Sequence, residues 1–311
     1  MRGATLFERP AQSIGQFQIL EDLRLSQQQW VVIGAPVALD ALHTDNTPAG
    51  GPEAIRGAFP YFDVVSRDRW IGDWNARRAV ALREMEPADL GDLSFGPSVT
   101  LQEYGLELQH AVSEVVVRGG RPLVLGGEHS LSFFVIQELA LQQDGLWIVH
   151  FDAHSDIQLG NVALAPLFNG NVMSHIAKLP GVAGSMHIGV REYEYGERAD
   201  LTDLFASPNW ISSSEIQTMP STLSKMIPQG SPVYLTVDLD VLDPASNPNV
   251  AWPAAAGLTS TELVSAVKFV AQNYQLVGAD VVELASSSRE MNLGALAASR
   301  LIMSILTAGL F

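Results

Sequence analysis

The segment at 150–156, His-Phe-Asp-Ala-His-Ser-Asp, combines carboxylate and imidazole side chains in a regular pattern. Asp152, His154 and Asp156 stand at alternating positions. In extended backbone, side chains two residues apart project to the same side, so these three potential ligands would converge on one point. Carboxylate oxygen and imidazole nitrogen suit divalent ions such as Mn²⁺, Ni²⁺ or Zn²⁺. Because burying such a group unpaired would be costly, the segment predicts a metal site.

Two further motifs add potential ligands of the same kinds. Gly-Gly-Glu-His-Ser at 126–130 follows an apolar run, and its two glycines permit a sharp turn from which His129 emerges. Asp238 and Asp240 alternate directly after another apolar run. Each of these two motifs alone is also typical of a turn or a helix cap. Together the three motifs offer four carboxylates and two imidazoles, more than one ion needs, so we expect two ions that share bridging carboxylates.

The pattern of apolar residues predicts the elements that must position these motifs. Short apolar runs, buried on both faces, are typical of strands in a covered parallel sheet. Runs with helical spacing alternate with them, and Ser130 and either Thr259 or Ser260 are candidate N-caps. The predicted strands are 30–34, 122–127, 146–151, 187–190, 233–237 and 277–282, and the predicted helices are 101–117, 131–141, 261–273 and 293–306.

This alternation of strands and helices predicts a three-layer α/β/α fold with a mostly parallel central sheet. We expect a single domain over 1–311, in which 1–25 form an irregular N-terminal arm. In an open parallel sheet, functional residues gather beyond the carboxyl ends of the strands, and all three motifs follow such ends.

Composition and charge narrow the classes of function. The formal net charge of −16 argues against binding nucleic-acid phosphates and suits a protein that attracts cations, although a solvated acidic surface explains it equally well. The absence of cysteine excludes disulfides and thiolate metal sites. We find no signal peptide in 1–18 and no apolar run of about 18 residues, so we expect a cytoplasmic protein that binds no membrane.

The chain resembles the ureohydrolase family of arginases, agmatinases, guanidinobutyrases and formimidoylglutamases. The resemblance rests on the three motifs, which are highly specific to this family. Supporting segments are Gly-Ala-Pro at 34–36, Gly-Pro-Glu-Ala-Ile-Arg at 51–56, Asp-Leu-Gly-Asp at 89–92 and Asp-Val-Val-Glu at 280–283. The resemblance implies an arginase-like fold, a homo-oligomer that is commonly a trimer or hexamer, and a pair of divalent ions, Mn²⁺ first with Ni²⁺ or Zn²⁺ as alternatives.

The same resemblance implies a role for each potential ligand. One ion would be held by His129, Asp152, Asp156 and Asp238, and the other by Asp152, His154, Asp238 and Asp240, so that Asp152 and Asp238 bridge. A water between two such ions loses a proton near neutral pH and can attack the central carbon of a guanidinium or formimino group. Asp156 would shuttle the proton. Glu283 would pair with the cationic substrate group, the alternative being a structural role at a strand end.

The loop after the second motif departs from the family pattern. It reads Phe-Asn-Gly-Asn-Val-Met-Ser-His at 168–175, and Asn169 stands where arginases and agmatinases usually carry His. His175 comes later and is interpreted as a helix residue. The Asn-Gly pair and the segment Ile-Gly-Val-Arg-Glu-Tyr at 188–193 are more similar to formimidoylglutamases. Asn169 is therefore a candidate substrate contact, and the loop does not decide between a guanidino and a formimino substrate.

A second departure follows Glu283, where Arg289 stands in place of an expected Asp. Arg289 and Arg191 could hold a substrate carboxylate, or could form ion pairs elsewhere. Three functions remain. We favour a hydrolase of a guanidino compound that releases urea, similar to agmatinase or guanidinobutyrase. The alternatives are a formimidoylglutamase-like hydrolase that releases formamide, and a catalytically silent subunit or binding partner, against which the six intact ligand positions argue.

Overall fold

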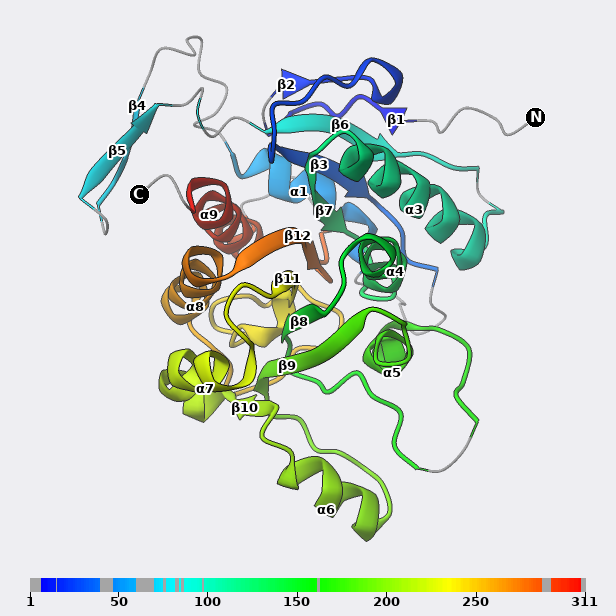
Figure 1. Ribbon diagram of the computed structural model, residues 1–311, viewed down its shortest axis with the longest axis vertical. Helices are drawn as coiled ribbons and strands as arrows, with labels where there is room; N and C mark the ends of the chain where they lie inside the picture. The colour runs from blue at the N-terminus through cyan, green and yellow to red at the C-terminus, as the bar shows by residue number, and fades with distance from the viewer. Residues whose placement is uncertain are drawn as a thin grey trace.

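A large mixed sheet forms the centre of the computed structural model (Figure 1). The structure describes residues 7–14, 16–39, 47–59, 70–74, 77–81, 84, 87–96, 98–160, 163–286 and 292–308. Among them, ten strands form the sheet in the order β1-β6-β3-β7-β12-β11-β8-β9-β10, with β2 also paired to β6. Only the β1–β6 pair of these strands is antiparallel, so the predicted mostly parallel sheet is confirmed.

The six predicted strands correspond to β3, β7, β8, β9, β11 and β12, with β9 beginning five residues before its predicted start, whereas β1, β2, β6 and β10 of the sheet were not predicted. Their bounds are β1 Phe7–Glu8, β2 Gln16–Phe17, β3 Trp30–Ala35, β6 Ala88–Leu93, β7 Arg121–Gly126, β8 Leu146–Phe151, β9 Val182–Val190, β10 Trp210–Ser212, β11 Pro232–Asp238 and β12 Gln275–Val282. A separate hairpin joins β4 Trp70–Asp73 and β5 Arg78–Ala81. The N-terminal arm is not wholly irregular, because β1 and β2 both pair with β6.

Helices cover both faces of the sheet (Figure 1). One layer holds α1 Gly51–Gly57, α7 Met219–Met226, α8 Ser260–Asn273 and α9 Leu293–Thr307. The other layer holds α3 Leu101–Val117, α4 Leu131–Gln142 and α5 Val172–Ile176, while α6 Arg198–Ala206 lies beyond the β10 edge. Short 3-10 helices are η1 Leu20–Asp22, η2 Pro48–Gly50, η3 Asn169–Asn171, η4 Ser213–Thr218 and η5 Leu239–Val241. The three-layer α/β/α fold is confirmed.

Two apolar cores, one on each face of the sheet, explain why the strands are apolar throughout. In β11, Val233 and Leu235 pack into the core beneath α8 and α9, whereas Tyr234 packs into the core beneath α3 and α4. Successive residues of a strand point to opposite faces, so a strand covered on both sides needs apolar residues at nearly every position.

The helix caps were predicted with mixed success. Thr259 caps α8, and its hydroxyl and the Glu262 carboxylate form a reciprocal capping box. Ser130 stands at the N-cap position of α4, as predicted, but its side chain makes no capping bond. Its hydroxyl instead donates to the Glu128 carboxylate at 2.5 Å.

Candidate metal centre

The sheet order brings the three motifs to one place. Strands β7, β12, β11 and β8 are consecutive neighbours and run in parallel, so their carboxyl ends lie side by side. His129 follows β7, Asp152 follows β8, Asp238 ends β11, and Glu283 follows β12. The site therefore lies at the sheet edge where an open α/β fold holds its ligands.

His129 Nδ1 is the centre of the first group of ligands. It lies 3.1 Å from Asp156 Oδ2, 3.2 Å from Asp152 Oδ2 and 3.4 Å from Asp238 Oδ2. The atom is buried, yet none of the described residues meets it with hydrogen-bond geometry. A buried nitrogen that faces three carboxylate oxygens without bonding to any of them fits a cation placed among them.

A second group of ligands adjoins the first. His154 Nδ1 lies 2.9 Å from Asp240 Oδ2 and 3.5 Å from Asp152 Oδ1. Two sets of side chains offer ligand atoms within 4.8 Å of one another, and Asp152 belongs to both. The sets are His129, His150, Asp152 and Asp156, and Asp152, His154 and Asp240. A shared Asp152 agrees with its predicted bridging role, while bridging by Asp238 stays a prediction.

The carboxylates of the site repel one another. Burial, followed by the charges of Asp240 and Asp152, raises the pKa of Asp238 well above its ordinary value. Burial and then Asp152 raise the pKa of Asp240 to about 6. For Asp152, burial acts in the same direction, but the neighbouring imidazoles outweigh it and hold the pKa well below its ordinary value. Divalent cations would remove this repulsion, so the residues present fit a metal centre.

Local backbone conformation decides where Asp156 and His129 lie. Asp156 has a φ of 51°, in the left-handed region, so it reaches the site through a turn and the predicted extended alternation ends before it. The peptide N–H of Met173 in α5 holds this turn by donating to the Asp156 carbonyl at 3.0 Å. Gly127 is needed for close approach, because a Cβ there would lie 2.2 Å from the Val37 carbonyl oxygen.

Glu283 lies beside the first group and is buried. Its φ is 61°, a second left-handed residue at the site. Its Oε1 accepts a hydrogen bond from the His129 backbone N–H at 2.7 Å. Burial raises the pKa of Glu283 to about 8, although the hydrogen bond from His129 acts in the opposite direction. The acid is thus held in contact with the loop that carries a potential metal ligand.

Two buried histidines complete the site and were not predicted from the sequence. His150 Nε2 lies 2.9 Å from Asp152 Oδ2, and His150 Nδ1 lies 2.9 Å from His187 Nδ1. The sequence pattern assigned both histidines only to apolar strands. The signal that could have found His150 is a polar residue within such a strand, two positions before Asp152 and on the same face.

Hydroxyl groups on the β11 side fix the His129 ring. His129 Nε2 lies 2.9 Å from Thr236 Oγ1, and the Ser132 hydroxyl donates to Asp280 Oδ2 at 2.7 Å with Thr236 3.5 Å away. The Tyr234 hydroxyl donates to the same oxygen at 2.7 Å. The Thr236 hydroxyl can accept a proton from Nε2, and that tautomer leaves Nδ1 with a lone pair for an ion.

The predicted substrate contacts have different surroundings. Asn169 is buried at the start of η3, and its Oδ1 accepts from the Gly170 N–H at 2.8 Å. His175 lies in α5, as interpreted from the sequence, and its Nε2 lies 3.0 Å from the Ala165 carbonyl. Arg289 lies outside the described residues.

Arg191 is engaged with the backbone. Its guanidinium donates to the carbonyl oxygens of Gly189, Asp240, Val241, Leu242, Ala254 and Ala255. These bonds use all three nitrogens of a group that has five N–H donors. The side chain therefore ties the η5 loop to the end of β9, and a substrate carboxylate would have to displace some of these bonds.

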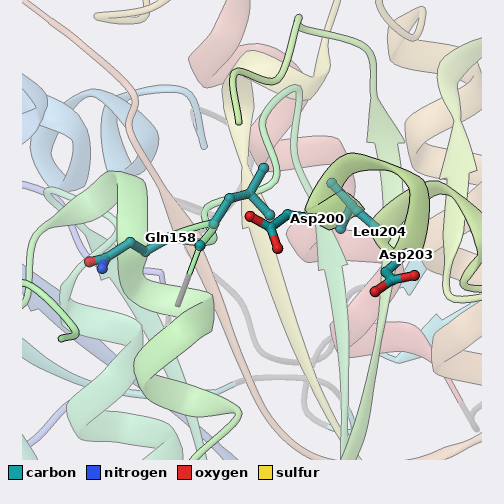
Figure 2. Close-up of a pocket in the computed structure, with 6 residues that line it drawn as sticks. Gln158, Asp200, Asp203 and Leu204 are labelled. Carbon is teal, nitrogen blue, oxygen red and sulfur yellow. The ribbon is translucent and has the colours of Figure 1, made fainter. Parts of the chain in front are cut away.

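A pocket of about 420 Å³ lies beside the segment that follows Asp156 (Figure 2). Asp200 and Asp203 contribute carboxylates from α6, and Gln158 lies on the other side (Figure 2). The lining residues are Gln158, Leu159, Gly160, Asp200, Asp203 and Leu204. None of the predicted metal ligands or substrate contacts is among them.

Comparison with known proteins agrees with this fold. The pattern of the arginase family matches residues 28–308. Agmatinase from Edwardsiella ictaluri (strain 93-146) is 30% identical over 287 residues, which cover 89% of this chain and 86% of that relative. Agmatinase from Bacillus anthracis is 30% identical over 234 residues, covering 72% of this chain and 76% of the relative. Proclavaminate amidino hydrolase from Streptomyces clavuligerus shares the fold, with a TM-score of 0.75 at 23% identity over 96% of both chains.

A buried His and Asp cluster at the strand ends of such a fold defines a metal-dependent hydrolase that acts on carbon–nitrogen bonds in linear amidines. The chain belongs to the arginase family. Within the described part of the chain, no helix is both long and apolar enough to cross a membrane.

Proposed function

We propose that this chain hydrolyses a guanidino compound and releases urea, with agmatine or a similar guanidino compound as substrate. The observation that carries the proposal is His129 Nδ1, a buried nitrogen among the oxygens of Asp152, Asp156 and Asp238 that has no hydrogen bond to any of them. Relatives at 30% identity that cover most of the chain are agmatinases, which supports a guanidino substrate.

The proposed ligand sets are those that the family resemblance implies, with Mn²⁺ as the first metal to test and Ni²⁺ and Zn²⁺ as alternatives. Two divalent ions, when bound, would supply a water that ionises near neutral pH. Asp156 would hold the proton, since its Oδ2 faces the centre of the first ligand group. Glu283 would orient the substrate, because a planar guanidinium can donate two N–H groups to one carboxylate.

A formimidoylglutamase-like activity is the second candidate, because Asn169 is buried where agmatinases usually carry His. A catalytically silent chain is the third, and the convergence of all six predicted ligands counts against it. The single domain, the homo-oligomer and the cytoplasmic location stay predictions.

A substrate panel tests the proposal. Protein loaded separately with Mn²⁺ and with Ni²⁺ is incubated with arginine, agmatine, guanidinobutyrate and formiminoglutamate, and urea and formamide are both measured. Urea from agmatine or guanidinobutyrate is the expected result. Formamide from formiminoglutamate would replace the proposal with the second candidate. Absence of turnover by metal-loaded protein on the whole panel would favour the silent chain.

A further inference from the structure

A chain of hydrogen bonds crosses two neighbouring strands and ends on Asp152. Parallel strands β8 and β9 place His150 directly opposite His187. Starting from Ser185, the links run from Oγ to His187 Nε2, from His187 Nδ1 to His150 Nδ1, and from His150 Nε2 to Asp152 Oδ2, each 2.9 Å long. His150 is 0% exposed and His187 4% exposed, so water cannot substitute for these partners.

The direction of each hydrogen bond in this chain follows from the last acceptor, the Asp152 carboxylate. A carboxylate only accepts, so His150 Nε2 carries the proton that it shares with Asp152. In the neutral form of His150 the Nδ1 is bare, and His187 then donates to it from its own Nδ1. His187 Nε2 is left as an acceptor for the Ser185 hydroxyl. Burial lowers the pKa of His187 well below its ordinary value, which agrees with a neutral ring.

The orientation of the His187 ring is also fixed by packing. Trp210 on β10 lies opposite His187 in the sheet. Its ring stacks on the His187 imidazole with centroids 3.9 Å apart and planes 22° from parallel. The His150 ring meets His187 at 88°, edge to face. The two contacts hold His187 in the plane in which its Nδ1 points at His150.

We propose that His187 is a positioning residue for the metal centre. Through His150, it orients the Asp152 carboxylate that both ligand groups share. The inference rests on the metal centre of the proposed function. His150 acts here as the link to Asp152 and not as a ligand, because both of its ring nitrogens already have partners at 2.9 Å. Partners that orient metal ligands in this way typically change metal affinity by about 10–100-fold when they are removed.

Two substitutions of His187 separate the contribution of its hydrogen bond to His150 from the contribution of its ring packing. His187→Phe keeps a ring that can stack on Trp210 but has no N–H for His150. His187→Asn loses the stacking but keeps an amide N–H close to the position of Nδ1. Mn²⁺ affinity is measured by competition with a chelator, and the melting temperature of each metal-free variant reports its folding.

We expect Mn²⁺ binding to weaken by about 10–100-fold in His187→Phe and to remain close to wild type in His187→Asn. Ile211→Ala, at the next position of β10, is the matched control, because it removes buried apolar packing and should lower the melting temperature without changing Mn²⁺ affinity. If His187→Asn binds Mn²⁺ no more tightly than His187→Phe, the inference is overturned while the metal centre stands. A wild-type protein that binds no Mn²⁺, Ni²⁺ or Zn²⁺ would instead overturn the proposed function, and this inference with it.

Proton positions provide an independent readout. In ¹⁵N-histidine-labelled protein loaded with Zn²⁺, long-range proton–nitrogen correlations distinguish the two tautomers of each ring. Signals lost in His187→Phe identify His187. Protonation of its Nδ1 is the expected result, and protonation of Nε2 would overturn the proposed direction of the hydrogen bonds.

Discussion

The backbone N–H of His129 donates a hydrogen bond of 2.7 Å to Glu283 Oε1, and the Glu283 N–H donates to the Gly127 carbonyl at 2.9 Å. These two bonds join the loop after β7 to the end of β12. The acid proposed to orient the substrate and the loop that carries a potential metal ligand are therefore held as one unit. A substitution at Glu283 that removes this acceptor should therefore alter the position of the loop that carries His129, and a change in that loop should alter the position of Glu283.

Glu283→Gln should leave about two ions per chain but lower kcat/KM for the natural substrate by at least about tenfold. The amide oxygen can still accept the His129 N–H, so the loop should keep its place, while the charge that attracts a guanidinium is lost. A tenfold loss corresponds to about 1.4 kcal/mol. Metal content, melting temperature and kinetics are measured on one preparation, and unchanged kcat/KM in a folded, loaded variant would remove Glu283 from the substrate site.

Asp238→Asn should abolish metal-dependent activity without lowering the stability of the metal-free protein. The Asp238 carboxylate is buried close to Asp152 and Asp240, and its Oδ1 accepts the Asp240 N–H at 2.8 Å. Asn keeps that acceptor and removes a repelled charge. Melting temperatures after chelation and activity after reloading test both parts. Substantial turnover by the variant would show that Asp238 is not an essential ligand.

Metal stoichiometry should depend on which ligand is removed. Asp152 belongs to both ligand groups, whereas Asp240 belongs only to the second. We therefore expect about two ions per chain in the wild type, about one in Asp240→Asn and nearly none in Asp152→Asn. Elemental analysis after loading and desalting gives these values. Equal metal content in the two variants would contradict a shared Asp152.

Metal-free protein should lose stability as the pH rises from about 5 to about 9. Burial chiefly raises the pKa of Asp240 to about 6 and that of Glu283 to about 8. The folded state thus keeps protons that the unfolded chain releases near pH 4, so this stabilisation is complete below about pH 4 and is lost as the pH passes the folded pKa values.

Bound divalent ions would replace those protons, so the difference in melting temperature between loaded and metal-free protein should widen with pH. Melting curves at about pH 5, 7 and 9, with and without chelator, measure that difference. A metal-free protein whose melting temperature rises over this range would show that other groups dominate.

Arg191→Lys should lower the free energy of unfolding by about 2 kcal/mol or more, since an ammonium cannot reproduce a fork of N–H groups that reaches six carbonyl oxygens. Arg300→Lys, on the exposed face of α9, is the control and should stay within about 0.5 kcal/mol of wild type. Denaturant unfolding compares the two. Unchanged stability in Arg191→Lys together with a raised KM for a carboxylated substrate would restore Arg191 as a substrate contact.

The layers of the fold and the types of ligand follow from the amino-acid sequence alone. Apolar runs such as 146–151 and 233–237 are typical of strands covered on both faces, and the structure has strands at those positions. Polar residues directly after such runs must lie at the carboxyl edge of a parallel sheet. For this reason His129, Asp152 and Asp238 could be grouped before any coordinates were known.

Which side chains meet across the sheet depends instead on the order of the strands. His150 and His187 are 37 positions apart, and their contact depends on β8 lying next to β9. Arg191 was predicted to hold a substrate carboxylate or to form an ion pair, but its donors are taken by the backbone of loops distant in sequence. Periodicity along a chain reports local conformation and burial, whereas the partner of a polar group depends on strand order and register. Those are set by the packing of the whole sheet.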